Sequence, residues 1–116
     1  MSIDLHMHSV YSDGVWTPAE LVKSAKEKQL LAIALTDHDT IAGLQETRVP
    51  AELAGIRFVN GVEINSHYYL NNKKRNIHVL GYLFDPEKLD PYMRQLKEVW
   101  DEHNEAIRRA LRVHGI

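Results

Sequence analysis

The sequence predicts an α/β domain built on a mainly parallel sheet. Segments with strand patterns alternate with segments of helical periodicity along the 116 residues. Residues 30–36 are almost wholly apolar, as expected for a strand that is buried on both faces. Histidines and carboxylates follow several of the expected strands directly. In parallel folds, chemistry gathers at the carboxyl ends of strands, so these residues are candidates for a functional site.

The first strand and helix have clear local signals. Residues 3–8 alternate apolar and polar side chains with the period of a strand, and residues 9–16 have the composition of a loop. Thr17 is a suitable helix cap, Pro18 suits the first helical position, and Glu20 completes a capping box. We expect this helix to extend to about residue 29.

The remaining elements follow from the same reasoning. After the strand at 30–36, a helix is expected from 40 to 54, interrupted or kinked at Pro50. A third strand is expected at 57–65 and a fourth at 76–84, joined by a polar segment. A long final helix then begins at one of two Asp-Pro pairs, at 85–86 or 90–91.

The composition gives no indication of a nucleic-acid coat protein, a disulfide-bonded protein or a membrane protein. Formal charge is −2, which gives no electrostatic argument for a nucleic-acid coat or a membrane surface. Because cysteine is absent, disulfides and cysteine-ligated metal sites are impossible, and a reducing, cytoplasmic location is expected. The N-terminus lacks the pattern of a signal peptide, and no apolar run is long enough to span a bilayer. The oligomeric state is left open.

Three residues near the N-terminus are candidate metal ligands. His6 and His8 are two apart on a strand, so both side chains point to the same face. For an isolated pair, a metal site and a mere polar stripe are about equally plausible. Asp13 lies in the following loop, close enough to act as a third ligand.

Further candidates follow the second strand. His38 is favoured as a ligand, while Asp37 and Asp39 are interpreted either as ligands or as groups that orient a histidine. Asp39 or Thr40 can cap the next helix at the same time.

Later strands add Glu63 at the end of the third and His78 within the fourth. Each signal is weak alone, but their joint placement is informative. Imidazole and oxygen ligands without thiolates favour Zn, Mn or Fe over Ca or Mg alone, and so many ligands indicate more than one cation. Such sites serve phosphoester and amide hydrolysis.

The candidate residues fall in segments that together resemble the PHP (polymerase and histidinol phosphatase) family. The segments cover nearly the whole chain in the family's order: Asp4-Leu5-His6-Met7-His8-Ser9, Ser12-Asp13-Gly14, Thr36-Asp37-His38-Asp39, Gly61-Val62-Glu63 and Ile77-His78-Val79-Leu80-Gly81. Their spacing is most similar to that of small stand-alone phosphoesterases that act on nucleotides, nucleoside bisphosphates or RNA 5′ ends.

The resemblance implies a distorted (β/α)7 TIM-like barrel with two or three divalent cations (Mn, Zn or Fe). It implies that His6 and His8 bind one cation, that Glu63 bridges it to a second bound by His78, and that Asp13 and His38 bind a third. The implied activity is hydrolysis of phosphate esters by a metal-activated hydroxide, including a 5′–3′ exonuclease activity. The substrate is then a phosphorylated small molecule or a nucleic-acid 5′ end. The alternatives are a histidinol-phosphate phosphatase and a non-catalytic metal-binding PHP module.

The sequence departs from the family pattern in one respect. No residue after His78 matches the later histidine and Asp-x-His ligands of the family, and a barrel of this type needs roughly 200 residues or more. We therefore expect residues 1–116 to be the N-terminal portion of a PHP domain, without the remaining barrel strands and C-terminal motifs. Whether this chain is active alone stays open. His103 and His114 are interpreted as helix-surface residues, and His67 is ambiguous. Lys73, Lys74 and Arg75 could reach a phosphate, but a solvated loop is the favoured interpretation.

Overall fold

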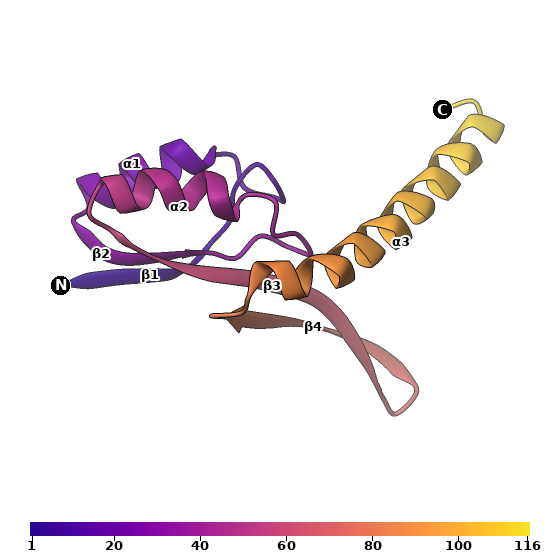
Figure 1. Ribbon diagram of the computed structural model, residues 1–116. Coiled ribbons are helices and arrows are strands. Elements are labelled where there is room, and N and C mark those ends of the chain that lie inside the picture. Colours follow the sequence, from indigo (N-terminus) through magenta and orange to yellow (C-terminus); the bar gives the residue numbers. More distant parts are fainter.

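The computed structural model describes residues 1–116 and contains one four-stranded sheet and three helices (Figure 1). The strands lie in the order of the chain: β1 (Ser2–Met7), β2 (Leu30–Leu35), β3 (Arg57–Leu70) and β4 (Lys73–Tyr82). The helices are α1 (Pro18–Glu27), α2 (Leu44–Leu53) and α3 (Pro86–Val113). The predicted α/β class is confirmed.

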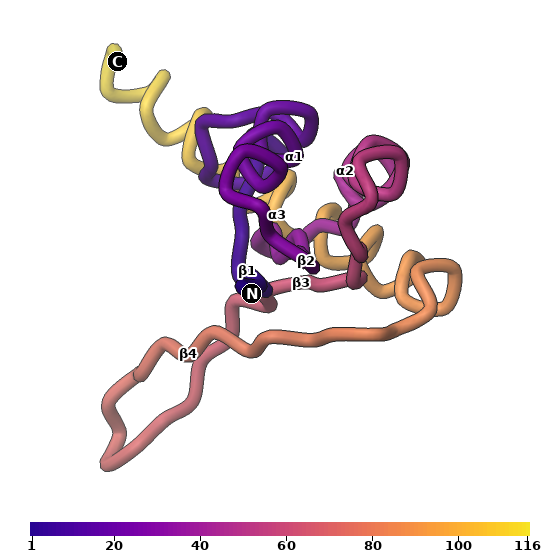
Figure 2. The backbone as a smooth tube through the Cα atoms, turned by 90° about the vertical axis from the view of Figure 1, so that its left-hand side faces the viewer, coloured from indigo at the N-terminus to yellow at the C-terminus, as the bar shows by residue number.

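The parallel part of the sheet carries the core. β2 pairs in parallel with β1 on one side and with β3 on the other. Both α1 and α2 cover the same face of these strands (Figure 2). Nine buried apolar residues form the core between them, including the fully buried Ile33 and Ala51 and the nearly buried Leu35. This layer holds the carboxyl ends of β1 and β2 in fixed positions.

Helix α1 begins as the sequence predicts. The Thr17 hydroxyl accepts a hydrogen bond from the backbone N–H of Glu20, and the Glu20 carboxylate accepts one from the backbone N–H of Thr17. Pro18 occupies the first turn, where its missing N–H has no partner to lose. The helix ends at Glu27, two residues before the expected position.

Helix α2 is shorter than predicted, since it begins at Leu44 rather than at residue 40. Asp39 has a left-handed backbone (φ 53°), and the Thr40 hydroxyl accepts a hydrogen bond from the N–H of Ala42, so this segment forms turns instead. Pro50 lies inside the helix without ending it. The helix therefore starts one turn further from the candidate ligands than expected.

Strands β3 and β4 form a long antiparallel hairpin, which the sequence did not predict. The expected loop between them is only the turn at Asn71 and Asn72, both with left-handed backbones (φ 50° and 60°). Lys73, Lys74 and Arg75 consequently belong to β4 and not to a solvated loop. The hairpin extends away from the helical layer (Figure 2).

Helix α3 begins at the first of the two expected Asp-Pro pairs. Asp85 caps it, with its side chain accepting a hydrogen bond from the N–H of Glu87, and Pro91 lies inside the helix. Its C-terminal half points away from the sheet (Figure 1), and Met93 is its only buried residue. None of the helices is long and apolar enough to cross a membrane.

Candidate metal centre

The candidate ligands meet where the parallel pairing of the sheet ends. The backbone N–H of Thr36 donates to the carbonyl of Met7, which joins the ends of β2 and β1. The N–H of Glu63 donates to the carbonyl of Asp37, and the N–H of Asp39 donates to the carbonyl of Glu63. His38 and Glu63 thereby form an isolated parallel bridge beyond the end of β2. β3 itself continues past Glu63 to Leu70, so this carboxylate lies within the strand rather than at its end.

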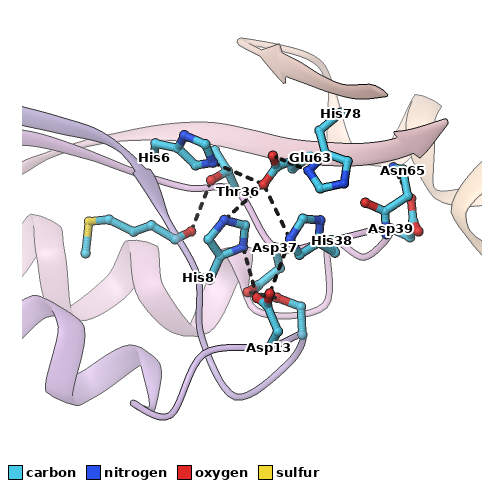
Figure 3. A network of polar contacts seen from close by, with 12 residues as sticks. His6, His8, Asp13, Thr36, Asp37, His38, Asp39, Glu63, Asn65 and His78 are labelled. Atoms are coloured by element: carbon cyan, nitrogen blue, oxygen red, sulfur yellow. Dashed lines mark hydrogen bonds and ion pairs between the residues drawn. The ribbon is translucent and has the colours of Figure 1, made fainter. Parts of the chain in front are cut away.

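Glu63 lies at the centre of the cluster (Figure 3). Its side chain is 6% exposed, and its Oε2 atom lies 3.1 Å from Nε2 of His6 and 2.9 Å from Nε2 of His8. Its Oε1 atom lies 3.2 Å from Nδ1 of His78, which comes from β4. One buried carboxylate therefore faces imidazoles from two other strand segments.

Asp13 and His38 extend the cluster toward the β1–α1 loop. The two carboxylate oxygens of Asp13 lie 3.5 Å from Nδ1 of His8 and 3.4 Å from Nε2 of His38. The rings of His8 and His38 are stacked, with centroids 4.5 Å apart and planes inclined by 19°. The Asp13 side chain is 67% exposed, so it forms the solvent side of the cluster.

All six predicted ligands thus come together in three overlapping groups whose potential ligand atoms lie within 4.8 Å of one another. The groups are His6, His8 and Glu63; His8, Asp13 and His38; and His38, Glu63 and His78. They differ from the arrangement implied by the resemblance in that His8 and His38 each belong to two groups. That these side chains hold metal stays a prediction.

The donor set fits divalent cations. Nδ1 of His8, which faces Asp13, is buried and has no hydrogen-bond partner, which is costly for a polar atom without a ligand. Nε2 of His8 approaches Glu63 closely without the alignment of a hydrogen bond, as two ligands of one ion do. Imidazole nitrogens and carboxylate oxygens are ligands that Zn, Mn and Fe accept.

The pKa of Glu63 is lowered from its ordinary value. Burial alone would raise this pKa because it disfavours the charged carboxylate, but the hydrogen bond from His6 and the charges of His38, His6 and His8 together outweigh it. The carboxylate is therefore ionised at neutral pH, as a bridging ligand requires.

Asp37 is hydrogen-bonded to the loop that carries Asp13. It is 1% exposed, and its carboxylate accepts hydrogen bonds from the Ser9 N–H (2.6 Å), the Ser9 hydroxyl (2.7 Å) and the Ser12 hydroxyl (2.7 Å). It forms no hydrogen bond to a histidine ring and belongs to none of the three groups. Sequence reasoning did not identify Ser9 and Ser12 as its partners. The presence of two serines in the loop that carries Asp13 was the sequence feature that could have indicated these hydrogen bonds.

Asp39 connects the cluster to distant parts of the chain. Its Oδ1 accepts a hydrogen bond from the N–H of Asn65 (2.9 Å), and its Oδ2 accepts one from the indole N–H of Trp100 on α3 (3.2 Å). It also forms no hydrogen bond to a histidine ring. The two aspartates flanking His38 thus fix the backbone and neighbouring elements rather than a ring.

A cleft of about 1220 Å³ opens beside the cluster. The predicted ligands Asp13, His38 and His78 line it, together with residues of the β1–α1 and β2–α2 connections, the β3–β4 hairpin and α3. His67, which the sequence left ambiguous, and Lys74 line the hairpin wall. His103 and His114 lie exposed on α3 and at its end, as expected.

Known proteins resemble this chain over most of its length. The family model described as PHP domain matches residues 4–113. A 5′–3′ exoribonuclease of Haemophilus influenzae is 44% identical over 93 residues, which are 80% of this chain and 32% of that protein. A 3′,5′-nucleoside bisphosphate phosphatase of Chromobacterium violaceum is 40% identical over 85 residues, 73% of this chain and 28% of that protein.

A solved structure has the same arrangement of elements. An amidohydrolase from Chromobacterium violaceum, determined with bound sulfate and no metal, superimposes with a TM-score of 0.80 at 34% sequence identity. The match covers 100% of this chain and 40% of that one. The present chain therefore spans about a third or less of the curated relatives above and less than half of this structure. Its open four-stranded sheet corresponds to part of the barrel-like fold, as predicted.

Proposed function

This chain belongs to the PHP domain family, and we propose that its histidine–carboxylate cluster serves a metal-dependent phosphoesterase. The substrates are phosphate esters of nucleotides, nucleoside bisphosphates or oligonucleotide 5′ ends. The observation that carries this proposal is the buried Glu63 carboxylate, surrounded by imidazoles from β1, the β2–α2 connection and β4. The relatives named for nucleotide and RNA hydrolysis support the substrate class.

The cluster would hold two or three divalent cations, of the kinds Mn, Zn or Fe, through its three overlapping groups. Bound there, such cations lower the pKa of a water molecule and offset the negative charge that a phosphate ester develops during hydrolysis. The protein's own part is to hold the ligands in place. Glu63 contributes a buried, ionised carboxylate, and the imidazoles contribute nitrogen lone pairs.

The substrate phosphate would approach from the cleft. Asp13, His38 and His78 face this side, whereas Glu63 is buried beneath them. Asp13 is the more exposed of the two carboxylates in the cluster, so it lies where the ester would enter. The cleft therefore provides a route for the ester to the cluster.

The proposal is tested with purified protein, wild type and His8→Ala, by measuring bound metal and phosphate release. The substrates are a nucleoside 3′,5′-bisphosphate, a 5′-phosphorylated oligonucleotide and histidinol phosphate. Since His8 belongs to two of the three groups, its loss is expected to remove bound metal and to lower the rate by about 100-fold or more. His114→Ala, which removes an exposed histidine at the end of α3, is the matched control.

Three other results would redirect the proposal. Full activity in His8→Ala contradicts a metal-centred mechanism. Best turnover of histidinol phosphate identifies the other phosphatase activity of the family. Stoichiometric metal binding with no hydrolysis of any ester identifies a non-catalytic metal-binding module.

A further inference from the structure

One face of the β3–β4 hairpin carries a row of polar and aromatic side chains that begins at the metal centre. Strand alternation places Glu63, Asn65, His67 and Tyr69 on the same face of β3. Their partners on β4 are Leu80, His78, Asn76 and Lys74. The row thus runs from the predicted ligands Glu63 and His78 outward to Tyr69 and Lys74. One wall of the cleft is lined by five members of the row: Asn65, His67, Lys74, Asn76 and His78.

This row is longer than a phosphate group requires. His78 and Lys74 both line the cleft and are four positions apart on β4, which corresponds to about 13 Å along a strand. The cleft volume, about 1220 Å³, also exceeds that of most pockets for small ligands, which is about 300–1,000 Å³. The cleft therefore has room for more of a substrate than the group that reaches the cluster.

The side chains of the row are suited to a nucleotide chain. The rings of His67 and Tyr69 meet edge to face, with centroids 5.7 Å apart, and offer an aromatic surface for a base. Asn65 and Asn76 carry amides that hydrogen-bond to base or sugar. Lys74 forms no ion pair, so its ammonium is free to contact a phosphate. The lysines and arginines that do form ion pairs are Arg48, Arg94, Lys97, Arg108 and Arg109.

The opposite wall of the cleft, formed by α3, is hydrogen-bonded to the residue next to His38. Trp100 on α3 donates its indole N–H to Asp39, the residue after His38, and remains 42% exposed at the cleft. Arg94 and Lys97 lie on the same wall, each paired with a carboxylate four residues away on α3. Aromatic and basic groups consequently face the cleft from both sides, as they do in single-strand binding grooves. Four carboxylates also line the cleft: Asp13, Asp39, Glu87 and Asp90. Asp13 is a predicted ligand, Asp39 accepts two hydrogen bonds and Asp90 is paired with Arg94.

We propose that this row is a subsite for the nucleotides that follow the phosphate at the metal centre, and that the substrate is a single-stranded oligonucleotide. The proposal rests on the phosphoesterase function proposed above. It deepens that function by distinguishing an oligonucleotide from a mononucleotide substrate. A duplex is excluded from the row because its bases are stacked on each other and cannot lie on His67.

Binding without catalysis tests the subsite directly. Fluorescence anisotropy in EDTA measures the affinity of 5′-phosphorylated, 3′-labelled single strands of one, three and six nucleotides. For the wild type, affinity is expected to rise about tenfold or more from one to three nucleotides, since each stacked base and contacted phosphate adds to it. Lys74→Ala and His67→Ala are each expected to remove most of this length-dependent gain.

Arg75→Ala is the matched control for Lys74→Ala. It removes the same charge from the neighbouring position of β4, whose side chain lies on the other face of the hairpin. Lys74→Ala should lower the slope of log affinity against log salt by about 0.7, the value for one phosphate contact to a single strand. Arg75→Ala should keep both the slope and the length-dependent gain.

Two outcomes overturn the subsite. One is an affinity that does not change with length, and the other is an equal loss of affinity in Lys74→Ala and Arg75→Ala. The two proposals fail in different ways. If only the phosphoesterase proposal is wrong, oligonucleotide binding still depends on length, but the protein hydrolyses no ester with any divalent cation. A blunt duplex of six base pairs that binds as well as the single strand also contradicts the proposal.

Discussion

At the scale of single residues, the buried polar side chains around the cluster have two distinct tasks. Glu63 faces the histidines, whereas Asp37 and Ser9 face each other and hold the loop that carries Asp13. The sequence predicted the first group because histidines and carboxylates recur at or near the ends of several strands, which is informative although each signal alone is weak. It did not predict the second, because a serine near an aspartate is common in loops and only the fold brings Ser9 next to Asp37.

Replacing Asp37 should therefore lower the free energy of unfolding, even in the absence of metal. Asp37→Ala leaves the N–H and hydroxyl of Ser9 without an acceptor in a buried environment. An unsatisfied buried group costs about 1–3 kcal/mol, so we expect a loss of about 2–4 kcal/mol in the free energy of unfolding. Urea denaturation of the metal-free protein measures this loss.

Asp101→Ala is the matched control for this measurement. Asp101 is an exposed aspartate of α3 paired with Lys97, so its loss is expected to change the free energy of unfolding by less than about 1 kcal/mol. Equal stability of the two variants would show that the Asp37 network contributes little.

At the scale of elements, prediction succeeded where the signals are local. The capping box of α1 depends on Thr17 and Glu20, three residues apart, and it forms as expected. The hairpin was missed because residues 66–76 do not alternate regularly between apolar and polar: Tyr68, Tyr69 and Leu70 are consecutive and the other residues are polar. Backbone pairing extends β3 and β4 there, with Asn71 and Asn72 forming the turn. The start of α2 was misplaced because Asp39 adopts a left-handed backbone next to a candidate ligand.

Close packing of β3 on β2 beside the cluster leads to a second prediction. A Cβ atom on Gly61 would lie 2.6 Å from the carbonyl oxygen of Leu35, so Gly61→Ala forces the backbone of β3 away from β2. We expect a loss of about 1–3 kcal/mol in stability, the usual cost of overpacking, and weaker metal binding at Glu63. Thermal unfolding and metal titration by calorimetry measure the two effects.

Gly81→Ala provides the comparison. Gly81 lies on β4 opposite Val62, and a Cβ there would approach only the Val62 side chain, at 3.4 Å. It should change stability and metal affinity much less. If both alanine variants behave alike, the contact between Gly61 and Leu35 is not what holds β3 against β2.

At the scale of the whole molecule, a single hydrophobic core supports a candidate metal centre whose residues come from several strands and loops. The nine-residue core lies on the helical side of the sheet, while Ile3 and Leu31 remain 59% and 50% exposed. Sequence spacing predicted that the ligands would share one edge of the sheet, since parallel strands end together. It could not predict that His8 and His38 would stack and be shared between groups, because that depends on how the two connecting loops fold.

Metal should therefore stabilise the whole molecule. A cation at 100 times its dissociation constant adds about 2.7 kcal/mol to the free energy of unfolding. We expect the thermal midpoint to rise when Mn²⁺ or Zn²⁺ is added to EDTA-treated protein and to return when EDTA is restored, as measured by scanning calorimetry. His8→Ala should show little of this rise, and an equal rise in both proteins would place the bound cation outside the cluster.

The position of the six predicted ligands along the chain also has a consequence for biosynthesis. All of them lie between His6 and His78, ahead of α3, which begins at Pro86. At about 5–20 residues per second, a ribosome makes this stretch within roughly 4–15 s. All six predicted ligands are therefore synthesised before the outer wall of the cleft. We expect that cations bound by these six residues would join β1, β2 and the hairpin once His78 has left the ribosome.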